Sequence, residues 1–180
     1  MAEAASAGLG CAGLVCAGLG FGANLGEAAA TLARAVREIE ERGIARRIAL
    51  SSLWRTPPWG RLDQPDFVNA CGLYETELAP RALLAALKKI ETDLGRIAGE
   101  RWGPRVLDID ILFYGETEIS EPDLAIPHRA LLSRAFVLAP LAEICGDRKI
   151  ASVRVADALA RLDCTGLAIL TAGDAWAQHA

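Results

Sequence analysis

Two aspartates that stand two positions apart, Asp108 and Asp110, are the residues of this sequence best suited to chemistry. They interrupt RWGPRVLDIDILF at 101–113, which otherwise predicts a buried β-strand. Side chains along a strand alternate between its faces, so both carboxylates would share one face, with Cα atoms roughly 6.5–7 Å apart. Two carboxylates at that spacing can reach one hard cation, or a pair of cations that bridge phosphates. The apolar residues predicted to face the other way are Leu107, Ile109, Ile111 and Phe113.

Arginines stand just upstream of the aspartates, at Arg96, Arg101 and Arg105, together with Trp102. Carboxylates for Mg²⁺ beside arginines for phosphate are the equipment of phosphoryl transfer. An acidic D-x-D on a solvent-facing edge strand commonly has no function, however. The two aspartates alone therefore leave both interpretations open.

The composition describes a folded globular chain. Its 180 residues, about half of them hydrophobic, suit one domain with a single core. The net charge of −4 counts against nucleic-acid binding, because such domains are usually basic. Five scattered cysteines without a CxxC pair, and only two histidines, argue against a disulfide framework or a structural zinc site. We expect reduced thiols in a cytoplasmic protein.

The first 14 residues, MAEAASAGLGCAGL, are rich in alanine and glycine and carry no lysine or arginine. A signal peptide needs a basic start and a longer apolar stretch. We expect a flexible tail over 1–14, with a cleaved leader as the alternative, and one domain over 15–180. No apolar run reaches about 18 residues, so no membrane span is predicted.

The pattern of elements predicts an α+β fold. Expected in chain order are a glycine-rich strand at 15–21, a helix at 27–42, strands at 48–55 and 67–76, a helix at 80–94 and the strand at 101–113. The order βαββαβ predicts a ferredoxin-like sandwich, an antiparallel sheet with helices on one face. A helix at 153–162 and a strand at 164–171 are expected as C-terminal additions. Glycine in the first strand indicates that something approaches its backbone closely.

Between the second and third strands, residues 56–66 contain three prolines and a glycine, which exclude regular structure. Loops this long in compact domains are often functional. In the third strand Phe67 and Asn69 share a face. Together they could stack on a flat heterocycle and hydrogen-bond to it, although the residues alone favour a core phenylalanine and a capping asparagine.

Two further side chains have open roles. Glu91 lies beside the apolar stripe of the second helix, where its carboxylate either needs a partner or ligand or reaches solvent. His128 precedes Arg129 and Arg134, which favours a phosphate contact, although a lone histidine is more often structural.

Six blocks of the sequence resemble one family, 6-hydroxymethyl-7,8-dihydropterin pyrophosphokinase of folate biosynthesis. The likeness covers roughly residues 16–145, and its most specific block is the one around the two aspartates. The blocks are FGANLG at 21–26, SSLWRTPPWG at 51–60, DQPDFVNA at 63–70, IETDLGR at 90–96, ERWGPRVLDIDILFYG at 100–115 and IPHRALLSRAFVLAPL at 126–141.

The resemblance implies a ferredoxin-like fold and transfer of diphosphate from ATP to the pterin hydroxymethyl group. Asp108 and Asp110 would bind two Mg²⁺ ions and, with Arg96 and Arg105, would be the catalytic residues. The implied pterin site comprises Thr56, Pro57, Pro58, Trp59, Phe67, Asn69, Trp102 and Phe136. The implied ATP site comprises Glu91, Arg96, Arg105, Ile111, His128 and Arg134. The expected partners are ATP and the pterin, with no nucleic acid and no membrane, and the expected state is a monomer.

The sequence departs from the family pattern at two places. Ala23 stands where the family usually has serine, and the loop 96–101 is one residue short and lacks the second arginine that many members carry soon after the first. The shorter loop bears on turnover rate more than on the substrate. Two rival interpretations are a non-catalytic nucleotide- or pterin-binding homologue and an RNA-binding ferredoxin-like module; the acidic charge and the D-x-D argue against the second.

Overall fold

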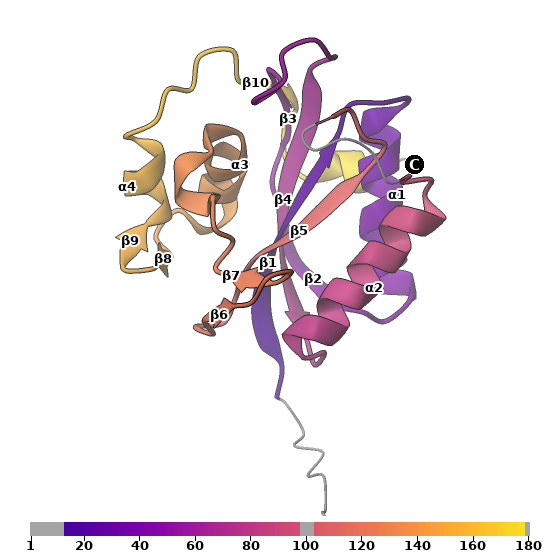
Figure 1. Cartoon of the computed structure of the whole chain (residues 1–180), viewed down its shortest axis with the longest axis vertical. Coiled ribbons are helices and arrows are strands. Elements are labelled where there is room, and N and C mark those ends of the chain that lie inside the picture. The colour runs from indigo at the N-terminus through magenta and orange to yellow at the C-terminus, as the bar shows by residue number, and fades with distance from the viewer. Residues whose placement is uncertain (1–12, 98–102, 179–180) are drawn as a thin grey trace, which may run out of the picture.

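The structure is a computed structural model that describes residues 13–97 and 103–178 (Figure 1). Most of the expected N-terminal tail, together with Arg101 and Trp102, lies outside the described residues. One six-stranded sheet organises the fold, and every strand pair in it is antiparallel. Its strands are β1 (Val15–Ala23), β2 (Arg46–Leu50), β3 (Leu53–Thr56), β4 (Phe67–Thr76), β5 (Asp108–Tyr114) and β10 (Ala168–Thr171).

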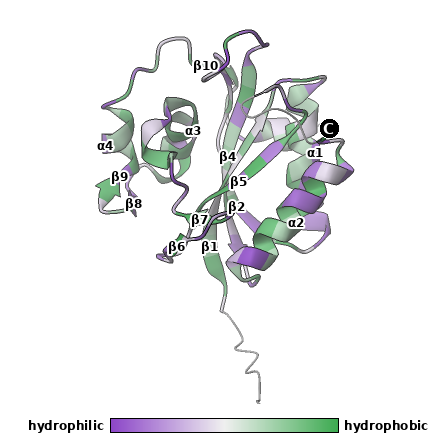
Figure 2. Cartoon of the chain, in the orientation of Figure 1, coloured by the Kyte–Doolittle hydropathy of each residue, from purple (hydrophilic) through white to green (hydrophobic). Residues whose placement is uncertain are grey.

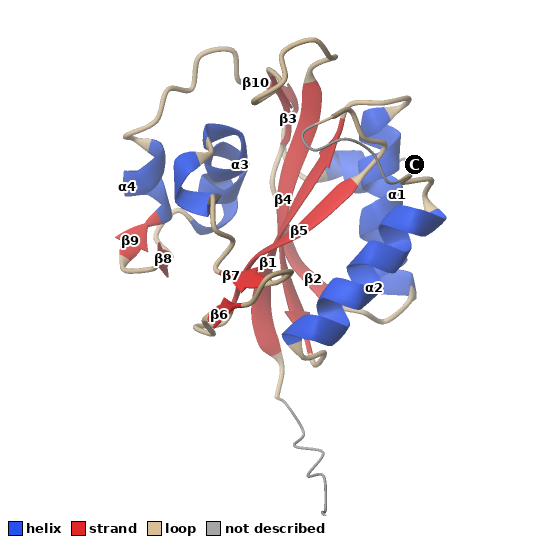
Figure 3. Ribbon diagram, viewed as in Figure 1, coloured by secondary structure: helices blue, strands red, loops and turns tan. Residues whose placement is uncertain are grey.

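The strand order is β10-β3-β4-β1-β5, with β2 also paired to β4. Helices α1 (Ala28–Glu41) and α2 (Pro80–Asp93) cover one face of the sheet, as Figure 3 shows. Both begin and end within a residue or two of their predicted bounds. Figure 2 shows hydrophilic residues along the outward side of α2, while Leu83, Leu87 and Ile90 of its apolar stripe are buried.

The opposite face carries two further helices, α3 (Ala135–Cys145) and α4 (Val155–Leu159), which follow the βαββαβ core in the chain (Figure 3). The sequence did not predict a helix at 135–145. α3 is apolar nearly all round and contains Pro140, so it shows no amphipathic stripe. Two separate apolar cores result, one on each side of the sheet.

The strand predicted at 48–55 is two strands, because Ser51 and Ser52 interrupt the regular strand conformation. The Ser51 hydroxyl accepts a hydrogen bond from the Cys71 N–H at 2.9 Å, in place of a regular ladder contact. The Ser52 N–H donates to Oε2 of Glu143 on α3 at 2.7 Å. Partners distant in sequence therefore create this break.

The strand around the aspartates starts at Asp108, seven residues later than predicted, and it contains a β-bulge. Gly18 pairs with Phe113 and Leu19 with Ile111, so Leu112 is an extra residue. As a result Phe113 packs in the core on the α3 side, whereas Ile109 and Ile111 face α1 and α2. The prediction that Phe113 shares their face was wrong.

The C-terminal additions are shorter than expected. The predicted helix at 153–162 is strand β9 (Val153–Arg154) followed by α4, and the predicted strand at 164–171 begins only at Ala168. The remaining elements are β6 (Ile119–Ser120), β7 (Ala125–Ile126), β8 (Lys149–Ile150) and the 3₁₀ turns η1 (Leu131–Ser133) and η2 (Ala175–Gln178). Within 13–97 and 103–178, no helix has the length and apolar character needed to cross a bilayer.

Candidate active site

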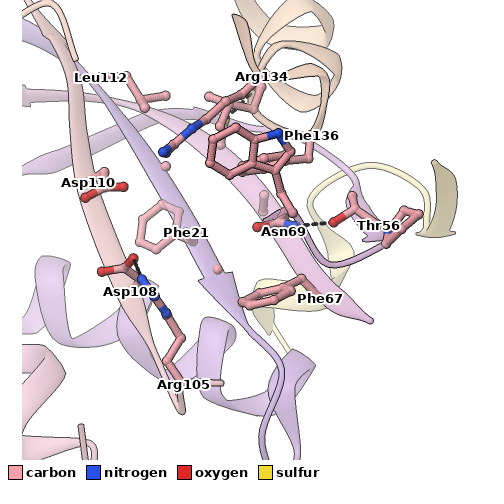
Figure 4. A pocket seen from close by; sticks show the side chains of 17 residues that line it. Phe21, Thr56, Phe67, Asn69, Arg105, Asp108, Asp110, Leu112, Arg134 and Phe136 are labelled. Atoms are coloured by element: carbon pink, nitrogen blue, oxygen red, sulfur yellow. Dashed lines mark hydrogen bonds and ion pairs between the residues drawn. The ribbon is translucent and has the colours of Figure 1, made fainter. Parts of the chain in front are cut away.

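A pocket with an empty volume of about 800 Å³, its open mouth included, lies on the α3 side of the sheet. Figure 4 shows side chains converging on it from the sheet strands, from the 56–66 loop and from the start of α3. Ten of the residues predicted for the site line it: Thr56, Pro57, Trp59, Phe67, Asn69, Arg105, Asp108, Asp110, Arg134 and Phe136. Residues separated by up to 80 positions are thus brought together at one place.

The floor of the pocket is the glycine-rich strand β1. Gly22 pairs with Asn69 on one side and Asp108 on the other, and Gly20 pairs with Cys71 and Asp110. A Cβ on Gly22 would lie 2.9 Å from Oδ1 of Asn69, and a larger side chain would fill the space between the amide and the carboxylates. The close approach predicted from glycine in this strand is that of neighbouring side chains, with Phe113 over Gly18, Leu112 over Gly20 and Asn69 beside Gly22.

Asp108 and Asp110 project from the same face of β5 into the pocket (Figure 4). Arg96 and Arg105 both form ion pairs with Asp108, and the Lys88 ammonium lies 3.6 Å from it. Burial by itself raises the pKa of Asp108, but the charges of Lys88, Arg105 and Arg96 outweigh it, and the net pKa is below the usual range. Asp108 is thus held as a carboxylate.

Asp110 differs from Asp108 because no described side chain or backbone group pairs with its carboxylate. Burial, and then the charge of Asp108, raise its pKa. A cation between the two groups would relieve both effects, and hard divalent cations prefer carboxylate oxygens. Within the described residues no cluster of three or more histidine, cysteine or acidic side chains could enclose a metal ion. The two carboxylates therefore suit Mg²⁺, which keeps water and substrate phosphate oxygens among its ligands.

Beneath the carboxylates, Glu91 of α2 is almost fully buried, with 1% of its surface exposed. Its Oε1 accepts the backbone N–H of Ile109 at 2.6 Å and the Lys88 ammonium at 2.7 Å, and its Oε2 accepts from Arg96. Of the two roles left open for Glu91, the structure supports the partnered one. Glu91 does not line the pocket but clamps the start of β5 and the cations that hold Asp108.

At the other end of the pocket lies an aromatic and amide group from β4 and α3. Phe67 and Phe136 both line the pocket, and Asn69 lies deeper, 8% exposed. The Asn69 amide donates to Oγ1 of Thr56 at 2.7 Å (Figure 4), which orients Oδ1 toward Gly22. The capping asparagine favoured by the sequence alone is instead a pocket residue.

Arg134 spans the space between the aromatic group and the aspartates. Its guanidinium lies 5.0 Å from the Trp59 ring centroid and 5.7 Å from that of Phe136, both within cation–π range. Its Nε is buried without a hydrogen-bond partner among the described residues. Burial lowers the pKa of Arg134, although Asp110 and Asp108 act in the opposite direction.

Some predicted site residues lie elsewhere. The pocket lining does not include Pro58, Glu91, Arg96, Ile111 or His128. Trp102 lies outside the described residues. Ile111 is in the core on the α1 and α2 side, 4% exposed. His128 accepts the Ala130 N–H at Nδ1, and burial lowers its pKa despite the nearby charge of Asp110.

Sequence reasoning missed seven lining residues: Gly20, Phe21, Gly22, Ala70, Cys71, Leu112 and Val137. The two glycines carried a signal, because an otherwise apolar strand with glycine at alternate positions offers a bare face. Cys71 and Leu112 carried one too, because each stands two residues after a predicted site residue on the same strand, Asn69 and Asp110.

Comparisons with known proteins agree with this geometry. A family model described as "7,8-dihydro-6-hydroxymethylpterin-pyrophosphokinase (HPPK)" matches residues 18–146. A 2-amino-4-hydroxy-6-hydroxymethyldihydropteridine pyrophosphokinase of Methylorubrum extorquens is 48% identical over 149 residues, covering 83% of this chain and 94% of its own. Its counterpart in Pseudomonas aeruginosa is 42% identical over 130 residues, covering 72% and 80%.

Among solved structures, wild-type Plasmodium falciparum HPPK-DHPS with pteroate superposes with a TM-score of 0.66 at 15% identity. The match covers 82% of this chain and 42% of that longer chain, and it shows a shared fold. The family model spans well over half of the present sequence, and two relatives match most of it. This chain therefore belongs to the 7,8-dihydro-6-hydroxymethylpterin-pyrophosphokinase family.

Proposed function

We propose that this protein transfers diphosphate from ATP to 6-hydroxymethyl-7,8-dihydropterin, giving AMP and the pterin diphosphate, in folate biosynthesis. The observation that carries this proposal is the combination found in one pocket. A pair of carboxylates on β5 and an aromatic and amide group on β4 and α3 face each other across the bare glycine floor of β1. Family membership supplies the identity of the substrates.

Phe67 and Phe136 are proposed to hold the flat pterin ring between them, while Asn69 reads its polar edge. Aromatic stacking provides affinity for any flat heterocycle, and the amide provides selectivity. Thr56 fixes the amide orientation through its hydrogen bond to Asn69. Pro57, Pro58, Trp59 and Trp102 complete the proposed pterin site.

The triphosphate is proposed to lie between Asp110 and the arginines. When bound, two Mg²⁺ ions on Asp108 and Asp110 would neutralise charge on the transferred group and polarise it. Arg105 and Arg134, which line the pocket, would contact phosphate oxygens, with Arg96 and His128 as further contacts. Glu91 and Ile111 would support the nucleotide side from beneath β5.

The protein's contribution to catalysis is placement and charge. The hydroxyl of the pterin must lie in line with the β-phosphorus and its leaving oxygen. The buried Glu91 carboxylate and its ion pair with Lys88 hold β5 rigid, so the carboxylates need no reorganisation as charge develops.

Further parts of the proposal concern the whole molecule. The sheet order β5-β1-β4, with β2 and β3 next and α1 and α2 on one face, supports a ferredoxin-like layout made of two interlocked βαβ units. A single domain over 15–180 is supported by one continuous sheet that includes β10. We further propose a monomer in the cytoplasm that binds neither nucleic acid nor membrane.

The test is release of AMP from Mg-ATP with and without the hydroxymethylpterin. We expect AMP to appear only when the pterin is present, with an equal amount of pterin diphosphate. Binding of both ligands without AMP release would identify a non-catalytic homologue instead and would refute the proposal.

A further inference from the structure

The C-terminal segment, residues 164–178, follows the region that the family model covers and yet borders the pocket. In Figure 1 the chain leaves α4, arcs over the top of the view and returns as β10 beside β3, before it ends near α1. No residue of this segment lines the pocket. Any influence on the site must therefore pass through its neighbours.

Strand β10 forms one of the two ladders that hold β3. Ala168 pairs with Arg55 and Ile169 with Trp54. On its other side β3 pairs with β4, which sets Thr56 opposite Phe67. Because β3 has only four residues, the loss of this ladder would leave it with one neighbouring strand, β4.

Two hydrogen bonds anchor the segment at the start of β3. The Gly173 N–H donates to Oγ of Ser52 at 3.0 Å, and the Trp176 indole N–H donates to the Ser51 carbonyl at 2.9 Å. Trp176 is buried in the core beside α1, with 7% of its surface exposed. The segment is therefore a fixed part of the fold.

The turn that precedes β10 touches the pocket wall from behind. Gly166 has a φ of +82°, and a Cβ placed on it would lie 2.7 Å from Cγ of Pro57 and 3.3 Å from its Cδ. Pro57 lines the pocket on its other side. The wall is thus supported by backbone that leaves no room for a side chain.

We propose that residues 164–178 position the pocket wall formed by Thr56, Pro57 and Trp59, and thereby determine affinity for the flat ring. The identity of the ring rests on the proposed function, whereas the positioning does not. Gly166 is the positioning residue, and it acts through Pro57 rather than by touching the ligand.

The first test is Gly166→Ala, measured by calorimetry with the hydroxymethylpterin in the presence of Mg²⁺ and a non-hydrolysable ATP analogue. Relief of the clash requires Pro57 to move by about 0.7 Å to reach ordinary contact, and displacements near 1 Å at a site are costly. We expect pterin binding about tenfold weaker, and binding of the ATP analogue alone changed less than twofold. Equal losses for both ligands would overturn the proposal.

Gly43→Ala is the matched control. Gly43 also has a positive φ, +63°, but nothing lies within 4 Å of a Cβ there, and it follows α1 away from the pocket. It reproduces the backbone strain of alanine in the left-handed region without the contact. We expect comparable destabilisation with unchanged affinity for both ligands.

Two further measurements test whether Gly166 acts on pterin binding through Pro57. In a Pro57→Ala background, which lacks Cγ and Cδ, Gly166→Ala should cause no additional loss of pterin affinity; an undiminished loss would show that Pro57 is not the route. In the ligand-free protein, Gly166→Ala should shift the indole N–H resonance of Trp59, and Gly43→Ala should not. If the wild type binds no pterin, the proposed function fails, while an unmoved Trp59 resonance overturns the positioning.

Discussion

Glu91 offers the sharpest test of how the aspartates are held. Its side chain is 1% exposed and receives hydrogen bonds from one backbone N–H and two cations. Replacement by glutamine keeps the size and removes the charge. The amide can satisfy at most part of this arrangement, because its nitrogen would face donors.

The expected loss in the free energy of unfolding follows from the burial of each partner of Glu91. Removing one partner of a buried ion pair costs about 3–5 kcal/mol. Here the Lys88 and Arg96 side chains remain 41% and 29% exposed, so water can partly solvate them after the change. The Ile109 N–H cannot be rescued in this way, because Ile109 is fully buried. We therefore expect Glu91→Gln to lower the free energy of unfolding by about 3 kcal/mol, the lower end of that range. This corresponds to a fall in Tm of about 6–12 °C for a chain of this length.

The assay is urea unfolding and a thermal melt of Glu91→Gln, with Glu77→Gln as the control. Glu77 is exposed at the loop before α2, so its replacement should change stability by less than about 0.5 kcal/mol. In the diphosphate-transfer assay, Glu91→Gln should lower kcat by a larger factor than it raises KM for the pterin. The reason is that the aromatic and amide group is untouched. A loss of unfolding free energy below about 1 kcal/mol would refute this role of Glu91, because neutralising a buried carboxylate with three donors costs more than that.

Other predictions follow from the same geometry. Asp110→Ala should abolish AMP release while the protein stays folded by circular dichroism; near-normal AMP release would refute its metal role. Phe136→Ala should weaken pterin binding in calorimetry by tenfold or more, as expected for about 1.4 kcal/mol or more of lost stacking and burial, with little effect on ATP; equal losses would contradict the proposed ring slot. Gly22→Ala should also weaken pterin binding, because its Cβ would press on Asn69. An unchanged Kd for the pterin would show that β1 and Asn69 can move apart to accept the methyl group. Burial raises the pKa of Cys145 to about 11. Since the thiolate is the reactive form, alkylation of Cys145 should be slow at pH 8 and rise steadily to pH 11, as followed by mass spectrometry; a plateau by pH 9 would contradict this.

Much of the fold was predictable because its signals are local. The stripes of α1 and α2 and the glycines that end them, Gly43 and Gly95, lie within single stretches of chain, and both glycines adopt the positive φ that favours them. The break at Ser51 was not predictable, because Glu143 and Trp176, some 90 and 125 positions away, hold it. The bulge at Leu112 likewise arises from its pairing with β1.

For the site, the chain's own alternation was sufficient to place Asp108 with Asp110, and Phe67 with Asn69, because the two-residue period of a strand is a property of the backbone. Tertiary structure alone decided that β1 separates these pairs and that its glycines leave the space between them empty. It also decided that Glu91 turns inward to hold β5, since a carboxylate on a helix stripe can be buried only where donors from another element meet it. Short-range pattern thus specified which residues act, and strand pairing specified what they face.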